Sequence, residues 1–391
     1  MKKNFLKLVL MSAITAFVFS CNKSDDDAST CNDGIQNGDE TGIDCGGSCE
    51  PCAVDNKLKG ELTGELTLDA SIAYELTGAF VVKDGGKLTI PAGTIIKATG
   101  STSSYVAIAQ GGKLFVNGTS ENPVIMTSGE TSPNAADWGG LVICGKAPVN
   151  TGDNSISEVA DLTYGGSTTD DNSGSIRYLR VEYTGAQFTN DKQFNGVSLF
   201  GVGSGTTFEY VQSYNGNDDG IEFFGGSVNG KYLVSTNAND DGIDFADGWS
   251  GTGEYWYVSG SAKAGIEGSN NGDNGDATPV TTATLSKITV VGPVGEGALY
   301  FKEGGGNFTV DNFYTTGINL GIKVKNTDTE AGVRIEAGKL VITNIQFDEK
   351  AAGFKTTSYE GANQTFFTEG TATGAGSGAD KPAWATGWTK F

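Results

Sequence analysis

Residues 217–223 read NDDGIEF and residues 239–245 read NDDGIDF, so two near copies lie 22 residues apart. Their core is a Gly followed by an apolar, a variable and an apolar residue, and related units recur with offsets of 24, 22, 23, 33 and 23 residues, one of them broken at its last position and one with Ala in place of the Gly. These units begin at Gly196, Gly220, Gly242, Gly265, Ala298 and Gly321. A fixed period of this length is typical of a solenoid, in which each repeat packs on its neighbours.

Stretches rich in β-branched and aromatic residues lie between these units, such as FEYVQSYNG from Phe208 and KYLVSTNA from Lys231. Such stretches favour strands, and no 3.6-residue periodicity follows the first 20 residues. We therefore predict an all-β fold, a right-handed parallel β-helix over residues 57–391, in which matching positions stack about 4.8 Å apart. A β-sandwich is the alternative fold, but it gives no reason for the same motif to repeat after 22 residues.

Asn215 and Asn237 lie beside the turns, again 22 residues apart. Their side-chain amides are predicted to stack and to hydrogen-bond between rungs. The C-terminal PAWATGWTKF, with Trp384 and Trp388, is expected to cap the last rung.

The first 20 residues, MKKNFLKLVLMSAITAFVFS, have the basic start and short apolar run of an export signal. Cys21 follows directly and resembles the lipidated cysteine of bacterial lipoproteins. The segment NKSDDD at residues 22–27, within the tether 21–30, resembles the acidic surface-export signal of Bacteroidetes lipoproteins. These resemblances imply a lipid-anchored protein of the outer membrane that faces the cell exterior, with the lipid as its sole membrane contact.

Four cysteines lie in residues 31–56: Cys31, Cys45, Cys49 and Cys52. In an exported chain they predict two disulfides, with the pairing left open, although four thiols can also bind zinc. Asp33, Asp39 and Asp44 offer oxygen ligands for Ca²⁺ between the cysteines. The alternative is a disulfide-linked spacer without a metal, which holds the main domain away from the membrane and is called the stapled spacer below. Cys144 stands alone and is expected to be buried.

The chain has no His and a formal net charge of −21. The lack of His excludes His-based triads and His metal ligands. The negative charge argues against nucleic acid as a partner and suits cations and neutral or cationic ligands.

The segments WGGLVICGKAPVN, GGKLFVNGTSENPVIMTSG and GVGSGTTFEYVQSYNGNDDGIEFFGG resemble a set of Bacteroidetes surface lipoproteins with β-helix repeats. The resemblance covers most of residues 57–391. It implies the fold and the surface address; members mostly carry no assigned activity, so it implies no reaction.

Carboxylates gather on three predicted rungs. Alternation along the strands turns Glu222, Asp244 and Glu267 outward in one column. Asp218 is expected to stack near Asp240, and Asp219 near Asp241. Like charges at this spacing need raised pKa values or a cation, and hard oxygen donors favour Ca²⁺. We therefore expect Ca²⁺ within residues 215–276, with these seven carboxylates as ligands; turn Asp residues that bond to local backbone groups are the alternative.

Three functions remain open on this sequence. The first is a binding or adhesion module for glycans, with Trp249 and Tyr255 stacking on sugar rings and Glu222 and Glu267 bonding to hydroxyl groups. The second is a Ca²⁺-dependent polysaccharide lyase or a glycoside hydrolase, because NDDGID resembles the acidic motif of polygalacturonase-type hydrolases; their His and Arg-x-Lys motifs are absent here. Its catalytic candidates are Asp218, Asp219, Asp240, Asp241 and Asp244. The third is an accessory subunit of an outer-membrane protein complex.

Overall fold

The computed structural model describes residues 31–391 except residues 42, 51–54, 326–328, 351 and 377. The described residues fall into two compact units, one before residue 56 and one from residue 56 to residue 391. The predicted signal peptide, Cys21 and the tether lie outside the described residues. No helix among the described residues has the length and apolar character needed to cross a bilayer.

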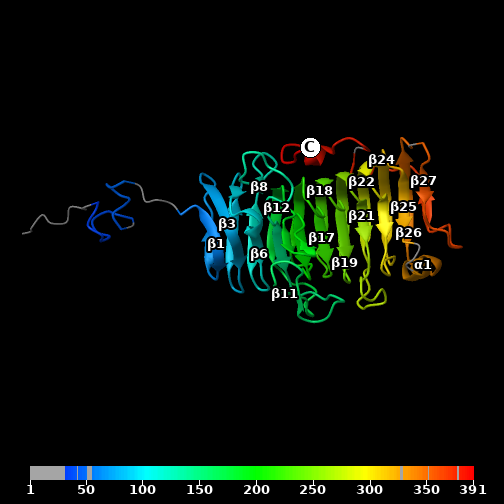
Figure 1. The fold of residues 1–391 in the computed structure, drawn as a ribbon, viewed down its shortest axis with the longest axis horizontal. Coiled ribbons are helices and arrows are strands. Elements are labelled where there is room, and N and C mark those ends of the chain that lie inside the picture. The colour runs from blue at the N-terminus through cyan, green and yellow to red at the C-terminus, as the bar shows by residue number, and fades with distance from the viewer. Residues whose placement is uncertain (1–30, 42, 51–54, 326–328, 351, 377) are drawn as a thin grey trace, which may run out of the picture. The chain divides into compact units, whose positions relative to one another are not determined.

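The larger unit is a right-handed parallel β-helix, as the 22-residue copies predict (Figure 1). Its 24-stranded sheet coils into three faces, and the strand pairs of this sheet are parallel. Face one begins with β2 (Glu65–Thr67), β4 (Lys87–Pro91) and β7 (Lys113–Asn117). Face two begins with β5 (Ile95–Ala98) and β8 (Val124–Ser128).

Later strands are longer and bend from face one onto face two. They are β12 (Gly174–Glu182), β16 (Thr207–Tyr214), β18 (Gly230–Ala238), β20 (Thr252–Ser261), β22 (Thr284–Val294), β24 (Thr309–Thr316) and β26 (Val341–Asp348). Tyr210 has a φ of 55° at the bend of β16, and Tyr232 and Tyr255 take the same conformation on the next rungs. The corner is therefore a column of left-handed residues.

Face three carries the Gly-apolar-X-apolar units. Its strands are β6 (Tyr105–Ile108), β9 (Leu141–Cys144), β15 (Val197–Phe200), β17 (Ile221–Phe224), β19 (Ile243–Ala246), β21 (Ala264–Gly268), β23 (Gly297–Phe301), β25 (Leu320–Val324) and β27 (Lys355–Thr357). Strands β1 (Lys57–Leu62) and β3 (Ala73–Val82) open the solenoid, and β28 (Phe367–Glu369) pairs with β26.

The inward residues stack in columns, as alternation predicts. Ile221 pairs in register with Ile243, and Ile243 with Ile266. Each is fully buried. The Asn ladder also forms, since Asn237 Nδ2 donates to Asn215 Oδ1 over 3.0 Å.

One element was not expected, and one expectation is wrong. The helix α1 (Thr329–Glu336) interrupts the strands, and it buries Ala331 and Ile335 although the segment is too short to show a helical period. The C-terminal tail does not cap the last rung. It runs back along face two, where Trp388 is buried and the tail end bonds to Gln212 of β16; the chain end lies beside the middle strands in Figure 1.

Insertions cover part of face three. The antiparallel pair β10 (Ser155–Ile156) and β11 (Thr163–Tyr164) and the pair β13 (Gln187–Thr189) and β14 (Lys192–Gln193) belong to them. Val159 and Phe194 from these insertions form an apolar cluster with outward residues of β9 and β15, among them Cys144. Cys144 is buried with a free thiol, as expected.

Candidate functional site

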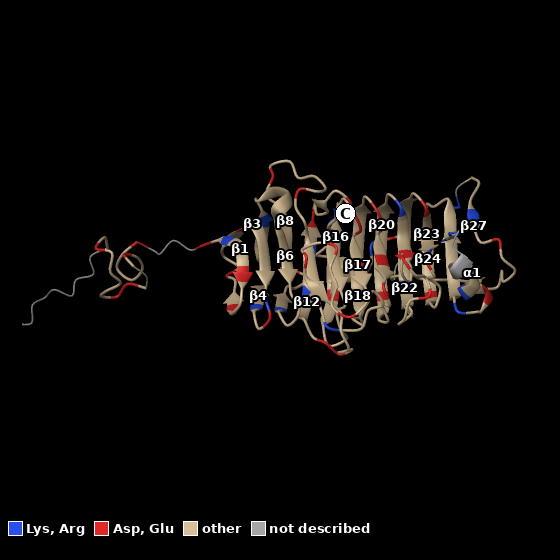
Figure 2. Ribbon diagram, turned by 60° about the horizontal axis from the view of Figure 1, so that its bottom comes forward, with Lys and Arg blue, Asp and Glu red and all other residues tan. Residues whose placement is uncertain are grey.

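The outward carboxylates of face three lie in one column. Glu222 pairs in register with Asp244, and Asp244 with Glu267. Ser198 precedes them, and Tyr300 follows. Acidic residues recur on neighbouring strands in Figure 2. The repeat therefore places these three carboxylates as predicted.

The column is not at the surface, however. Glu222, Asp244 and Glu267 are only 9%, 8% and 2% exposed. Asn195, from the insertion before β15, donates its Nδ2 to Glu222 Oε2 over 2.6 Å. Lys302 Nζ lies 2.5 Å from Glu267 Oε1. The expectation that Glu222 and Glu267 meet a glycan is therefore wrong, because side chains from outside the repeat cover them.

Asp219 and Asp241 form a second ladder at the preceding turn. Asp219 Oδ1 accepts the backbone N–H of Asp241 over 2.8 Å, and Asp241 Oδ1 accepts that of Ala264 over 2.5 Å. Asn195 Oδ1 begins the ladder on the backbone N–H of Asp219. The sequence left two roles open for these residues, Ca²⁺ binding and hydrogen bonding to the backbone of the turns. One oxygen of each Asp has the second role.

Asp218 and Asp240 lie nearer the solvent on the same two turns. Lys263 Nζ lies 2.7 Å from Asp240, so this carboxylate is paired. Asp218 contacts Asp240, and burial, followed by the charge of Asp240, raises the pKa of Asp218 to about 7. The predicted stacking of these two residues is confirmed.

Burial raises the pKa of every inner carboxylate. It raises the pKa of Asp241 to about 10, and the neighbouring charges of Glu267 and Asp244 add to it. The pKa values of Asp219, Glu222 and Asp244 lie well above their ordinary range for the same two reasons. These groups therefore favour a proton or a cation among them.

Three carboxylates come close enough to share one ion. The candidate ligand atoms of Asp219, Asp241 and Asp244 lie within 4.8 Å of one another, and all three residues are buried. Asp244 Oδ1 has no hydrogen-bond partner among the described residues. Asp218, Asp219 and Asp240 form a second close group, nearer the solvent.

The predicted sugar-stacking residues do not present free rings. Trp249 is fully buried, with its ring 4.7 Å from that of Phe223 and its indole N–H donating to the Val228 carbonyl. Its expected exposure is wrong. Tyr255 stacks on Tyr232 on one side and receives the Lys287 amine 4.4 Å from its centroid on the other. Both faces of Tyr255 are therefore occupied.

An open groove on face one was missed by the sequence reasoning. This polar groove, of about 350 Å³, is lined by Ser204, Thr206, Thr207, Phe208, Glu209, Asn229, Gly230, Lys231, Thr252 and Glu254. Arg177, Glu209, Lys231 and Glu254 stack in register with alternating charge. Each precedes a tyrosine, as RY, EY, KY and EY, and this recurring pair is the signal that could have revealed the column.

The charges of the polar groove are fixed by ion pairs. Lys231 Nζ lies 2.9 Å from Glu254 Oε2, and Lys287 Nζ lies 2.5 Å from Glu254 Oε1. Burial acts to raise the pKa of Glu254, but its hydrogen bonds to the two lysines outweigh that effect and lower it. The hydrogen bond to Glu254 raises the pKa of Lys231.

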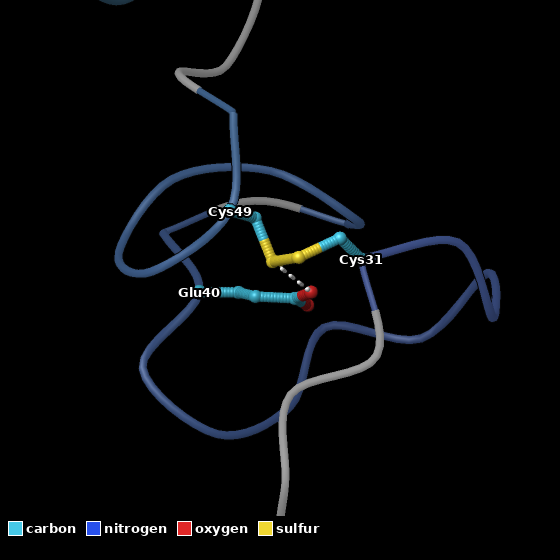
Figure 3. A group of neighbouring side chains, drawn as sticks. All are labelled: Cys31, Glu40 and Cys49. Atoms are coloured by element: carbon cyan, nitrogen blue, oxygen red, sulfur yellow. Dashed lines mark hydrogen bonds between the residues drawn. A yellow bond between two sulfur atoms is a disulfide. The ribbon is translucent and has the colours of Figure 1, made fainter.

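In the cysteine-rich unit, Cys31 and Cys49 form a disulfide with Cα atoms 5.5 Å apart (Figure 3). Cys45 is also disulfide-bonded, whereas Cys52 lies outside the described residues. Disulfide formation removes the thiolates that zinc needs, so the zinc alternative is wrong for these cysteines. Cys49 Sγ lies 3.3 Å from Glu40 Oε1, a contact in which the disulfide sulfur has no proton to donate.

The carboxylates between these cysteines already have hydrogen-bond partners. Asp44 accepts the backbone N–H groups of Asp33 and Gly34. Asp33 accepts the amide of Asn37, and Asp39 accepts the hydroxyl of Ser48. This arrangement supports the stapled-spacer alternative more than a Ca²⁺ loop.

Comparison with known proteins adds the family. No curated protein and no solved structure matches the chain. The model of the pectate-lyase-like β-helix domain matches residues 60–389, which is most of the chain and almost all of the solenoid. Together with the parallel three-faced coil, this match shows that the chain belongs to the family of pectate-lyase-like β-helix domains.

Proposed function

We propose that this chain is a carbohydrate-binding protein that binds a glycan in the polar groove of face one. The main support for this proposal is the lining of that groove, in which hydroxyl, amide, amine and carboxylate groups face the same open space. A hydroxyl-rich ligand needs such donors and acceptors side by side. Successive rungs repeat them about every 4.8 Å, so a linear glycan along the solenoid axis meets similar contacts at each step.

The chemistry of the groove supports binding more than turnover. A hydrolase needs a carboxylic acid that holds its proton near neutral pH, and a lyase needs a base. The pKa of Glu254 is lowered and that of Lys231 is raised, so both groups are held in their charged forms. Asp219, Asp241 and Asp244, three of the catalytic candidates, are too buried to reach a polymer.

Calorimetric titration with a panel of neutral and acidic oligosaccharides tests the proposal. Lys231→Met is expected to weaken binding at least tenfold, because it removes a donor and leaves Glu254 with one ion pair. Lys83→Met is the matched control: Lys83 is 38% exposed against 37% for Lys231, and it pairs with Glu61 of another rung outside the groove. Binding that is equal in both variants, or absent from the wild-type protein, would contradict the proposal.

A polysaccharide lyase or hydrolase is the second candidate, and the family description favours it. An activity assay decides between the two candidates. The same oligosaccharides are incubated with the protein, and the mixture is checked for unsaturated products and new reducing ends. Products that form at a constant rate per enzyme would replace the binding proposal. A partner that co-purifies from native membranes, with neither binding nor products, would instead indicate an accessory subunit.

We further propose that Cys21 carries the lipid and that the solenoid faces the cell exterior. The export-type residues 1–20 and the acidic tether after Cys21 support this address. Metabolic labelling with an alkyne fatty acid is expected to mark the wild-type protein and not Cys21→Ser. Protease added to intact cells should remove the protein; a protected protein would contradict the outward orientation.

A further inference from the structure

The carboxylates around β17, β19 and β21 exceed the cations that neutralise them. Lys302 pairs with Glu267, Lys263 with Asp240, and Lys192 with Glu158. Among the described residues, no ion pair reaches the remaining five: Asp218, Asp219, Glu222, Asp241 and Asp244. Unpaired carboxylates below the surface are costly, so this excess requires another positive charge or bound protons.

The backbone ladder holds two of these carboxylates in fixed orientations. The Oδ1 atoms of Asp219 and Asp241 each accept a backbone N–H from the next rung. This is a rigid arrangement, since both acceptors are tied to backbone groups of neighbouring rungs.

Asp244 provides an independent sign that a ligand belongs here. Its side chain is more than nine-tenths buried, and its Oδ1 has no hydrogen-bond partner among the described residues. A buried, unsatisfied carboxylate oxygen is rare in native proteins and calls for an ion or water. The ligand atoms of Asp244 lie within 4.8 Å of those of Asp219 and Asp241.

We propose that Asp219, Asp241 and Asp244 bind one Ca²⁺ ion that joins two neighbouring rungs of the solenoid. Mg²⁺ usually keeps several of its waters and takes only one or two carboxylates, so a buried group of three carboxylates suits Ca²⁺ better. All three ligands are hard oxygen donors, as Ca²⁺ prefers. The site does not depend on the glycan proposal, because it lies on face three and the turn before it, and not on face one.

The other four carboxylates are less suited as ligands. Asp240 and Glu267 are paired with lysines, and Glu222 accepts the amide of Asn195. Asp218 lies nearer the solvent beside Asp240. The structure thus narrows the seven expected ligands to three, and it assigns the ion a structural role between the rungs of β17 and β19.

Thermal unfolding and calorimetric titration with CaCl₂ on the full chain test this site. The wild-type protein, stripped with chelator, is expected to bind one equivalent of Ca²⁺ and to gain several degrees in Tm, with a smaller gain in MgCl₂. Asp244→Asn keeps the side-chain shape and removes the charge, so its Tm without Ca²⁺ should equal or exceed that of the wild type. This variant should lose the gain produced by Ca²⁺.

Asp39→Asn is the matched control, because Asp39 belongs to the other acidic cluster, between the cysteines. It is expected to keep the full response to Ca²⁺. The proposal is overturned if Ca²⁺ neither binds nor shifts the wild-type Tm, which would mean that protons alone neutralise the three carboxylates. It is overturned equally if Asp244→Asn responds as the wild type does, or if Asp39→Asn loses the response.

Discussion

Single residues at the corners decide how tightly the chain can coil. Asn237 has a φ of 55°, a conformation that costs most residues energy but that Asn and Gly tolerate. The same residue also donates its amide to Asn215. Asn237 thus stabilises the turn through its backbone conformation and the contact with the neighbouring rung through its side-chain amide.

Two substitutions at Asn237 separate these contributions. Asn237→Gly keeps the left-handed backbone and loses the amide bond, so we expect a loss of about 0.5–1.5 kcal/mol in unfolding free energy. Asn237→Ala loses the bond and also strains the backbone, which adds about 1–2 kcal/mol. Urea unfolding of both variants measures the difference. Equal stabilities of the two variants would show that the corner conformation carries no cost at this site.

Asp247 makes stability depend on pH. Burial, followed by the charges of Glu158, Glu303 and Asp273, raises its pKa to about 7 in the folded chain, against 3.8 ordinarily. The folded state therefore holds this proton where the unfolded state releases it, and the contribution of Asp247 to stability falls as pH rises from about 4 to about 7.

Asp247→Asn removes this titration, and Asn tolerates the φ of 56° at this position. In chelator-treated protein we expect the variant to gain on the order of 1–3 kcal/mol over the wild type at pH 8, and little at pH 4. Urea unfolding at the two pH values checks the result. A difference that does not change with pH would assign the effect to packing instead of charge.

At the scale of strands, the repeat in the sequence predicted the register of the strands and the burial of the repeated positions. The register of Glu222 with Asp244 follows from a 22-residue copy, and so does the burial of Ile221 and Ile243. The side chains that cover these carboxylates could not be predicted from the repeat. Asn195 lies in an insertion without periodicity, and Lys302 follows β23, so their positions depend on long-range packing that no local pattern encodes.

The C-terminal tail shows the same limit. Its two tryptophans predicted a cap on the last rung, but the place where the tail packs depends on the outward residues of face two, which present an apolar strip at Val234 and Tyr257. The tail fills that strip with Ala375, Ala385 and Trp388. Tail residues thus complete a surface that the solenoid strands leave apolar.

Trp388→Ala measures this packing. The side chain is fully buried and lies against Tyr178 and Tyr210, so we expect a loss of about 3–5 kcal/mol in unfolding free energy. Phe391→Ala is the control within the same tail, because Phe391 is 48% exposed and should cost far less. Chemical unfolding of both variants gives the comparison. Equal losses would mean that the tail is not packed on face two in solution.

At the scale of the whole solenoid, each rung contacts only its neighbours, so the rungs alone would unfold with limited cooperativity. The tail adds contacts that cross many rungs. Arg180 of β12 bonds to the Trp388 carbonyl, Tyr257 of β20 to that of Ala379, and Gln346 of β26 accepts the N–H of Ala372. One segment of about 20 residues therefore ties β12 to β26.

Deletion of residues 372–391 is therefore expected to change the cooperativity of unfolding as well as the stability. The full chain should unfold its solenoid in one transition, whereas the shortened chain should show a broader transition, or two, with a lower slope against urea. Trp388→Ala keeps most of the tail contacts and should shift the midpoint with an unchanged slope. Fluorescence and circular dichroism followed together measure both. If the shortened chain keeps the full slope in a single transition, the nearest-neighbour contacts of the rungs suffice for cooperativity, and the tail acts only as a local cover for Val234 and Tyr257.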